Sequence, residues 1–349
     1  ENVVSVHGGK LKITPDLNSV TSLIADSIRT VSDLEIAGNS KVYLIGDIRT
    51  ISSSTNNGTT FTKKSLPFNL TSISFVNQNT GYGVFYNVLL KTNNAASSWD
   101  TVYKTSDGSF LRNINFLNDN TGFMYKSYYT GEYSTDTLCF TTNGGTNWTS
   151  TKISNYIRSF YEYEEYKTFY NLQLFANGTG YFNYSYSLRS QTNDSLYVGY
   201  YRTTNFGQTF QLVTLDSLMF PINFINENTG FGRIANYSLY KTTDKGTSWT
   251  RTGRIPNYLF ENFVRKVLFV NSNTGFVLTS FRTLMIIGKT TDGGATWSDK
   301  RFDLENASAT DMKFYGEQLG FIYGGETGQI FRTTDGGSTF VVQTTSEIT

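Results

Sequence analysis

The chain offers few groups that could carry acid–base chemistry. Its acidic residues are densest at Glu162, Glu164 and Glu165. Glycoside hydrolysis needs two carboxylates facing each other across about 5–9.5 Å, and nothing in the sequence brings a second carboxylate opposite these three. A Ser-His-Asp site would depend on His7, the only histidine, and no nucleophile-elbow motif accompanies it. No catalytic residue is therefore assigned, and the sequence favours a protein that is not an enzyme.

Metal and cofactor sites are equally poorly supported. With one histidine and one cysteine, Cys139, the chain lacks the ligands of an ordinary zinc site and cannot form an intrachain disulfide. Asp244, Asp292 and Asp335 each stand alone in a turn, far short of the 6–8 oxygens that calcium takes. We therefore expect no metal and no cofactor. Cys139 lies between Leu138 and Phe140, and we expect a buried, inert thiol.

The charge composition restricts the partners. The net charge is +1, and charged residues make up 16% of the 349 residues, against about 25% in ordinary soluble domains. Without a basic stripe, a nucleic-acid partner is not expected. No run of 18 apolar residues is present, so no membrane span is expected. The uncharged polar composition indicates a secreted, periplasmic or cell-surface protein, and we expect any signal peptide or lipid-anchoring cysteine to lie upstream of residue 1.

Two phrases recur along the chain and predict its architecture. The first is an aromatic-led strand ending in Asn-x-Asn-Thr-Gly-aromatic, clearest at 269–276 (FVNSNTGF). The second is Thr-Thr-Asp-Gly-Gly-x-Thr-Trp, clearest at 290–297 (TTDGGATW). Both read as tight turns between strands, because Asn and Asp accept backbone hydrogen bonds and Gly adopts positive φ. The acceptor of the second turn falls at Asn56, Asn94, Asn143, Asn205, Asp244, Asp292 and Asp335, and we expect these seven residues to be structural.

Self-similarity at about 40–50 residues with four strands per unit is typical of a β-propeller. The predicted fold is all-β: a single β-propeller domain over residues 1–349, made of four-stranded antiparallel blades. Residues 31–342 supply seven repeats, so seven blades are favoured. Residues 1–30 hold an additional strand pair around His7, which either closes the ring or begins a partial eighth blade.

The second phrase resembles the Asp-box, or BNR repeat, of sialidases, sortilin-type receptors, oligoxyloglucan hydrolases and the photosystem II assembly-factor family. Paired with the first phrase it is most similar to the last of these and to related secreted bacterial propellers. That resemblance implies an arginine patch, for which Arg112 and Arg265 are the best counterparts. The sialidase motif Arg-Ile-Pro occurs at 254–256, but it follows the fifth turn here, whereas in sialidases it precedes the first.

The repeat lengths indicate where a partner binds. From the first turn's glycine to the second turn's acceptor the chain takes 13 residues between Gly81 and Asn94, but 21 between Gly122 and Asn143 and 25 between Gly180 and Asn205. This added length falls between strands 2 and 3 of a blade. These connections, and those from strand 4 to the next blade, leave an antiparallel blade at the same end, which we call the long-loop end. Binding residues concentrate on such loops.

The predicted binding surface is a tyrosine-rich rim over residues 125–133, 156–170 and 184–200. Tyrosine gives a large contact area at low entropic cost together with a hydroxyl group. We expect a protein or glycan partner there, and the alternative is a carbohydrate-active enzyme, sialidase-like or another glycoside hydrolase, on the same scaffold. The candidate binding residues are Arg112, Tyr128, Tyr129, Arg158, Tyr161, Tyr163, Glu164, Tyr166, Tyr186, Arg189, Arg254 and Arg265.

Overall fold

The computed structural model describes residues 4–7, 10–13, 31–38, 40–129, 133–158, 163–190, 194–213, 219–234, 237–256, 264–281, 284–303, 309–323, 330–343 and 345–346. Side chains at 153–171 and 184–198 lie outside this description. The chain packs into two compact units, Glu1–Leu70 with Thr252–Thr349, and Thr71–Arg251. None of the described segments is a helix long and apolar enough to cross a membrane.

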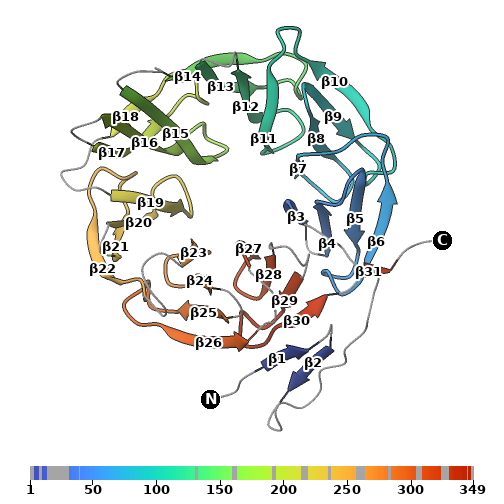
Figure 1. Ribbon diagram of the computed structural model, residues 1–349, viewed down its shortest axis with the longest axis vertical. Coiled ribbons are helices and arrows are strands. Elements are labelled where there is room, and N and C mark those ends of the chain that lie inside the picture. Colours follow the sequence, from blue (N-terminus) through green and yellow to red (C-terminus); the bar gives the residue numbers. More distant parts are fainter. Residues whose placement is uncertain are drawn as a thin grey trace. The chain divides into compact units, whose positions relative to one another are not determined.

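The chain is all-β, and seven blades of four antiparallel strands make up its β-propeller fold, as predicted (Figure 1). In the first unit, blade 1 has the strands β3 (Asp33–Ala37), β4 (Lys41–Ile45), β5 (Thr50–Ser54) and β6 (Phe61–Ser65). Blade 6 has β23 (Val264–Phe269), β24 (Gly275–Phe281), β25 (Leu284–Thr290) and β26 (Ser298–Asp303). Blade 7 has β27 (Asp311–Tyr315), β28 (Leu319–Tyr323), β29 (Ile330–Thr333) and β30 (Val341–Gln343).

In the second unit, blade 2 has β7 (Ser72–Phe75), β8 (Gly81–Phe85), β9 (Val88–Thr92) and β10 (Asp100–Lys104). Blade 3 has β11 (Phe110–Phe116), β12 (Gly122–Tyr129), β13 (Tyr133–Thr141) and β14 (Thr149–Arg158). Blade 4 has β15 (Tyr163–Leu174), β16 (Gly180–Ser190), β17 (Asp194–Thr203) and β18 (Gln211–Val213). Blade 5 has β19 (Met219–Phe224), β20 (Gly230–Ile234), β21 (Ser238–Thr242) and β22 (Thr250–Arg254), of which the last crosses the boundary between the units.

The expectation that residues 1–30 close the ring or begin a partial eighth blade stays a prediction, because the structure describes only residues 4–7 and 10–13 of that segment. There, β1 (Val4–His7) and β2 (Lys10–Ile13) form a two-stranded sheet of their own. At the other end of the chain, β31 (Thr345–Ser346) joins blade 1 and pairs in parallel with β6 (Figure 1). Because β6 is the outermost strand of its blade, it has an unpaired edge that a segment from the far end of the chain can occupy.

The predicted long loops of blades 3 and 4 are largely strand. Residues 125–129, 156–158, 163–170, 184–190 and 194–200 extend β12 to β17 beyond the length of the other blades' strands. Their Tyr-, Thr- and Ser-rich sequences suit pleated, half-exposed strands, which explains why the added residues pair instead of forming loops. β14 also pairs with β15, Ile157 opposite Glu165 and Arg158 opposite Glu164, so blades 3 and 4 form one eight-stranded sheet.

The turn between strands 3 and 4 has the same hydrogen bonds in all seven repeats. In blade 6, Thr290 Oγ1 donates to Asp292 Oδ1 at 2.8 Å and accepts the Gly294 N–H at 2.9 Å. Asp292 accepts the N–H of Thr296, four residues further along the chain. Gly294 has φ 90°, which glycine adopts without strain. These bonds to Thr296 and Thr290 hold the pKa of Asp292 down, at about 2.

The first phrase packs the blade through its glycine and its leading phenylalanine. A Cβ on Gly275 would lie 2.6 Å from the Phe269 ring, so only glycine lets that ring cover the strand. The Trp297 ring meets Phe269 edge-on at 6.2 Å, and its Nε1–H donates to Gly294 O at 3.2 Å. The two phrases of a repeat therefore pack against each other, and the same contact recurs in other blades.

Cys139 is buried, as predicted. It is 1% exposed among the apolar residues that blade 3 packs toward blade 2. Its Sγ lies 3.3 Å from Ser150 Oγ, and burial raises the pKa of the thiol. A neutral, buried thiol is a poor nucleophile, so its role is packing.

Replacing Thr290 with Val tests the structural role of the turn. The substitution keeps the side-chain shape but leaves the buried Gly294 N–H without its acceptor, so the free energy of unfolding should fall by about 1–3 kcal/mol. Urea denaturation measures the change. Thr296→Val is the matched control, because Thr296 is exposed and water can replace its hydroxyl contacts. Equal midpoints for the two variants would contradict the assignment.

Candidate functional site

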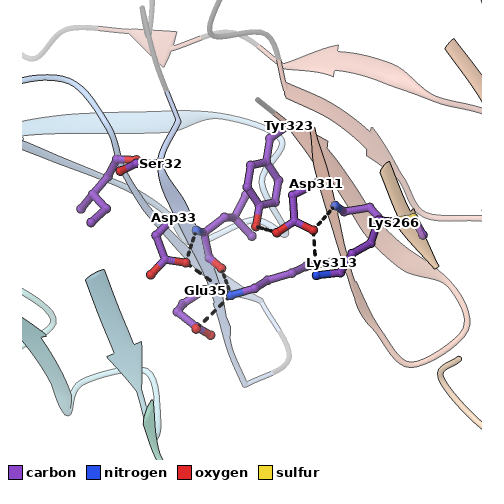
Figure 2. Close-up of polar contacts among 10 residues, drawn as sticks. Ser32, Asp33, Glu35, Lys266, Asp311, Lys313 and Tyr323 are labelled. Carbon is purple, nitrogen blue, oxygen red and sulfur yellow. Dashed lines mark hydrogen bonds and ion pairs between the residues drawn. The ribbon is translucent and has the colours of Figure 1, made fainter. Parts of the chain in front are cut away.

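A cluster of charges joins the innermost strands of blades 1 and 7, both in the first unit (Figure 2). Lys313 on β27 reaches β3, where its Nζ lies 3.0 Å from Glu35 Oε1 and 3.5 Å from Asp33 Oδ1. It also donates to Leu34 O at 2.5 Å. The ammonium group thus has two carboxylates and a carbonyl as partners. A charge that has lost part of its contact with water requires such partners.

A second charged residue of β27, Asp311, lies beside Lys313. Asp311 Oδ1 is 3.0 Å from Lys266 Nζ on β23, the innermost strand of blade 6. Its Oδ2 accepts the Tyr323 hydroxyl at 3.1 Å (Figure 2). Burial raises the pKa of that hydroxyl, so Tyr323 is a neutral donor. Three blades therefore contribute to one polar network along their innermost strands.

The network favours the charged form of Lys313 and the protonated form of Glu35. Burial alone would lower the pKa of Lys313, but attraction to Glu35 and Asp33 outweighs it and raises the pKa. For Glu35, burial dominates and raises the pKa above its usual value in spite of Lys313. The side chains of Asp33, Glu35 and Lys313 remain 19–34% exposed. A small molecule at these strands would thus meet a carboxyl group that protonates more readily than usual.

The distances bear on the enzyme alternative. Asp33 Oδ1 and Glu35 Oε1 contact the same nitrogen at 3.5 and 3.0 Å, so these oxygens lie no more than 6.5 Å apart. Glycosidase carboxylate pairs stand about 5–9.5 Å apart, so this upper limit overlaps only the lower part of their range. However, the two residues stand two apart on one strand and both turn to one ammonium group, whereas a glycosidase pair flanks the scissile bond. Within the described ranges, no group of His, Cys, Asp or Glu side chains could hold a metal ion.

Arg112 lies on β11, the innermost strand of blade 3. Its Nη2 is 3.0 Å from Asp136 Oδ1 on β13 and also contacts Ser127 Oγ. Ser127 Oγ in turn lies 2.5 Å from the same carboxylate oxygen. The Arg112 side chain is 56% exposed. Arg112 therefore combines an ion pair with an accessible guanidinium group.

The other predicted residues are distributed over several blades. Tyr128 and Tyr129 are exposed on β12, by 41% and 61%. Arg254 is exposed at the end of β22, and Arg265 on β23 donates to Ser280 O at 3.2 Å. Arg112 and Arg265 occupy equivalent strands of blades 3 and 6 and have different hydrogen-bond partners. The two blades belong to different units, so the arginine patch stays a prediction.

Strand register brings together three predicted residues whose side chains lie outside the described part. Arg158 stands opposite Glu164, and Glu164 stands opposite Arg189 on the next strand. This places alternating charges in one row across β14, β15 and β16. Tyr163, Tyr166 and Tyr186 lie on the same strands, and Tyr161 is outside the described residues.

Sequence reasoning missed the Lys313 cluster. Its signal is the alternation of charges in two innermost strands, Asp33 with Glu35 and Asp311 with Lys313. Residues two positions apart on a strand point to the same side, so each pair lies on one side of its strand. Only the packing of blade 7 against blade 1 shows that these two pairs of residues face each other.

The fold is shared with solved propellers. No protein-family model matches the sequence, and no curated protein does either. The chain is similar to YCF48 bound to a D1 peptide, with 16% identity, a TM-score of 0.59, and coverage of 89% of this chain and 95% of that one. YCF48 from Cyanidioschyzon merolae gives 13% identity, a TM-score of 0.59 and coverage of 89% and 97%. An ancestral GH74 enzyme gives 15% identity, a TM-score of 0.58 and coverage of 90% and 46%.

These similarities confirm the predicted resemblance to photosystem II assembly-factor-like propellers at the level of the fold. At identities this low they carry no residue role from one chain to another, because one fold hosts many functions.

Replacing Lys313 with Met tests whether the cluster stabilises the first unit. The variant removes the ammonium group that contacts Glu35, Asp33 and Leu34 O, so the free energy of unfolding should fall by about 1–3 kcal/mol. Lys266→Met is the matched control, because Lys266 is similarly exposed, 36% against 34%, but contributes a single ion pair worth about 0–1 kcal/mol. Urea denaturation compares the two, and a Lys313 variant no less stable than the control would contradict this role.

Proposed function

We propose that this chain is a non-catalytic binding propeller of the cell envelope or exterior, which recognises a protein or glycan partner at the long-loop end of blades 3 and 4. The observation that carries the proposal is the eight-stranded sheet of β11 to β18, whose hairpins extend well beyond the strands of the other blades. Rigid strands present side chains with less entropic cost on binding than flexible loops do.

The exposed side chains at this end support a binding role. Tyr128 and Tyr129 keep large parts of their rings in solvent, and Arg112 has an accessible guanidinium group. Tyrosine and arginine are the residue types that dominate protein interfaces. Among the fold neighbours, one YCF48 structure contains a D1 peptide, which is consistent with a protein partner. The low charge content supports the extracellular or envelope location, and the seven turns support assignment as Asp-boxes.

A carbohydrate-active enzyme is the second candidate, favoured by the proximity of Asp33 to Glu35 and by the raised pKa of Glu35. The GH74 neighbour has the same fold. Against it, Asp33 and Glu35 stand two apart on one strand and share the Lys313 ammonium group, whereas a glycosidase needs one carboxylate on each side of the bound sugar. The binding role is therefore preferred.

A binding screen tests the proposal. Wild-type protein is presented to a glycan array and to a phage-displayed library of random peptides, and at least one specific ligand is expected. Replacing Tyr161, Tyr163 and Tyr166 together with Ala should weaken its capture by about 2 kcal/mol, roughly 30-fold, with little change in melting temperature. Tyr315→Ala is the control, because Tyr315 is 46% exposed in blade 7.

The screen also separates the two candidates. Equal retention of the ligand by wild type and the triple variant would remove these tyrosines from consideration. Any glycan ligand is then incubated with wild type and with Glu35→Gln, and products are sought by mass spectrometry. Cleavage by wild type that Glu35→Gln abolishes would replace the binding proposal with the enzyme.

A further inference from the structure

Three large aromatic side chains are exposed together where blades 2 and 3 meet in the second unit. Tyr86, in the turn between β8 and β9, is 61% exposed, Phe110 at the start of β11 is 47% exposed, and Tyr128 is 41% exposed. The Tyr86 and Phe110 ring centroids are 6.3 Å apart, with the rings tilted by 50°. A Cβ on Gly108 would lie 3.9 Å from the Tyr128 ring, which places that ring beside the segment leading to Phe110. Grouped exposed apolar side chains mark interaction surfaces more than scattered ones do.

The backbone beneath these rings is held firmly. Tyr86 has φ 50°, in the left-handed region where a bulky residue is uncommon. Its carbonyl accepts the Leu111 N–H at 2.7 Å, and Asn87 O accepts the Thr105 N–H at 3.0 Å. The Asn87 side chain returns a bond to Thr105 O at 3.1 Å. Arg49 and Tyr237 have the same conformation in the corresponding turns of blades 1 and 5, so it belongs to this turn of the blade. The turn and its hydrogen bonds hold the Tyr86 backbone in place while the side chain remains in solvent.

Charges around the rings are largely compensated. Lys126 lies 2.5 Å from Asp107, and Arg112 lies 3.0 Å from Asp136. A compensated pair does not attract a charged ligand strongly, yet its outer N–H groups and lone pairs still bond to hydroxyls. One further cation, Lys104, lies at the end of β10 opposite Val88. The surface therefore suits an uncharged partner with many hydroxyl groups.

The backbone contacts also argue against a peptide. A bound peptide brings N–H and C=O groups that need partners. At this surface the carbonyls of Tyr86 and Asn87 and the N–H groups of Leu111 and Thr105 already bond to each other. A pyranose ring makes no such demand, because its C–H face stacks on an aromatic ring and its hydroxyls bond to side chains.

From these contacts we infer that Tyr86, Phe110 and Tyr128 form a binding surface for a neutral polysaccharide. The inference rests on the proposed binding function and specifies its ligand class. The tilted rings of Tyr86 and Phe110 contact successive sugar residues, while Arg112, Asp136, Lys126 and Asp107 bond to their hydroxyls.

Affinity gel electrophoresis of the full chain tests this inference. Native gels contain xyloglucan, galactomannan or arabinoxylan as neutral polymers, polygalacturonate as an acidic polymer, or no polymer. Wild type should be retarded by at least one neutral polymer. The double variant Tyr86→Asn, Phe110→Ser should lose at least 10-fold in affinity, and Asn is chosen because it tolerates the left-handed conformation. Tyr315→Ser, which removes an exposed tyrosine of blade 7, should bind like wild type.

Several results would overturn it: no retardation by any neutral polymer, retardation by polygalacturonate alone, or equal retardation of the double variant and wild type. Melting temperatures establish that each variant is folded. If the peptide library or glycan array yields a ligand that depends on Tyr161, Tyr163 and Tyr166 but not on Tyr86 and Phe110, the proposed function stands and this inference fails. If that library, that array and these gels all yield no ligand, both fail.

Discussion

Within the compact units, stacked aromatic rings attach blade 2 to blade 3, blade 4 to blade 5 and blade 6 to blade 7, and the rest of the structure depends on this contact. Tyr82 of blade 2 stacks on Phe116 of blade 3 with centroids 3.4 Å apart, and Tyr181 of blade 4 stacks on Phe224 of blade 5 at 3.5 Å. The Tyr82 hydroxyl also donates to Asp119 O at 2.7 Å. Such a ring pair stabilises by about 0.5–1.5 kcal/mol beyond the area it buries. The repeated phrase therefore specifies both the strand and its attachment to the neighbouring blade.

Between blades 7 and 1, charged side chains contribute to the attachment that ring pairs provide elsewhere. Blade 1 has Ile36 near the position of the leading phenylalanine, so no ring is available for stacking. Phe321 packs instead with Leu34 and Phe61 in an apolar cluster. Lys313 adds bonds to Asp33, Glu35 and Leu34 O at this junction. Since breaking a largely buried ion pair costs far more than a surface pair contributes, such a network fixes the alignment of two strands even where its net stabilisation is small.

A scaffold fixed in this way can change at the long-loop end of its blades without losing its packing. The lengthened strands of blades 3 and 4 retain their ladder hydrogen bonds, and β14 pairs with β15 beyond the ordinary limit of a blade. Tyr128 and Tyr129, which lie on the lengthened part of β12, are exposed. In the first unit, by contrast, Asp33, Glu35 and Asp311 form ion pairs with lysines. Binding at exposed strands therefore accounts for more of this structure than catalysis at its innermost strands.

The sequence by itself determined the blades and their turns. The bonds that define a turn join residues no more than four apart, as between Thr290, Asp292 and Gly294, so a short phrase is sufficient to specify them. The burial of Cys139 could be predicted for a similar reason, because its strand neighbours are apolar. Only the tertiary structure decided that the added residues of blades 3 and 4 are strands, that Arg158, Glu164 and Arg189 stand in one row, and that Lys313 meets carboxylates 278 to 280 positions away. Those features depend on which strands lie side by side and in what register, and no local pattern of residue types contains that information.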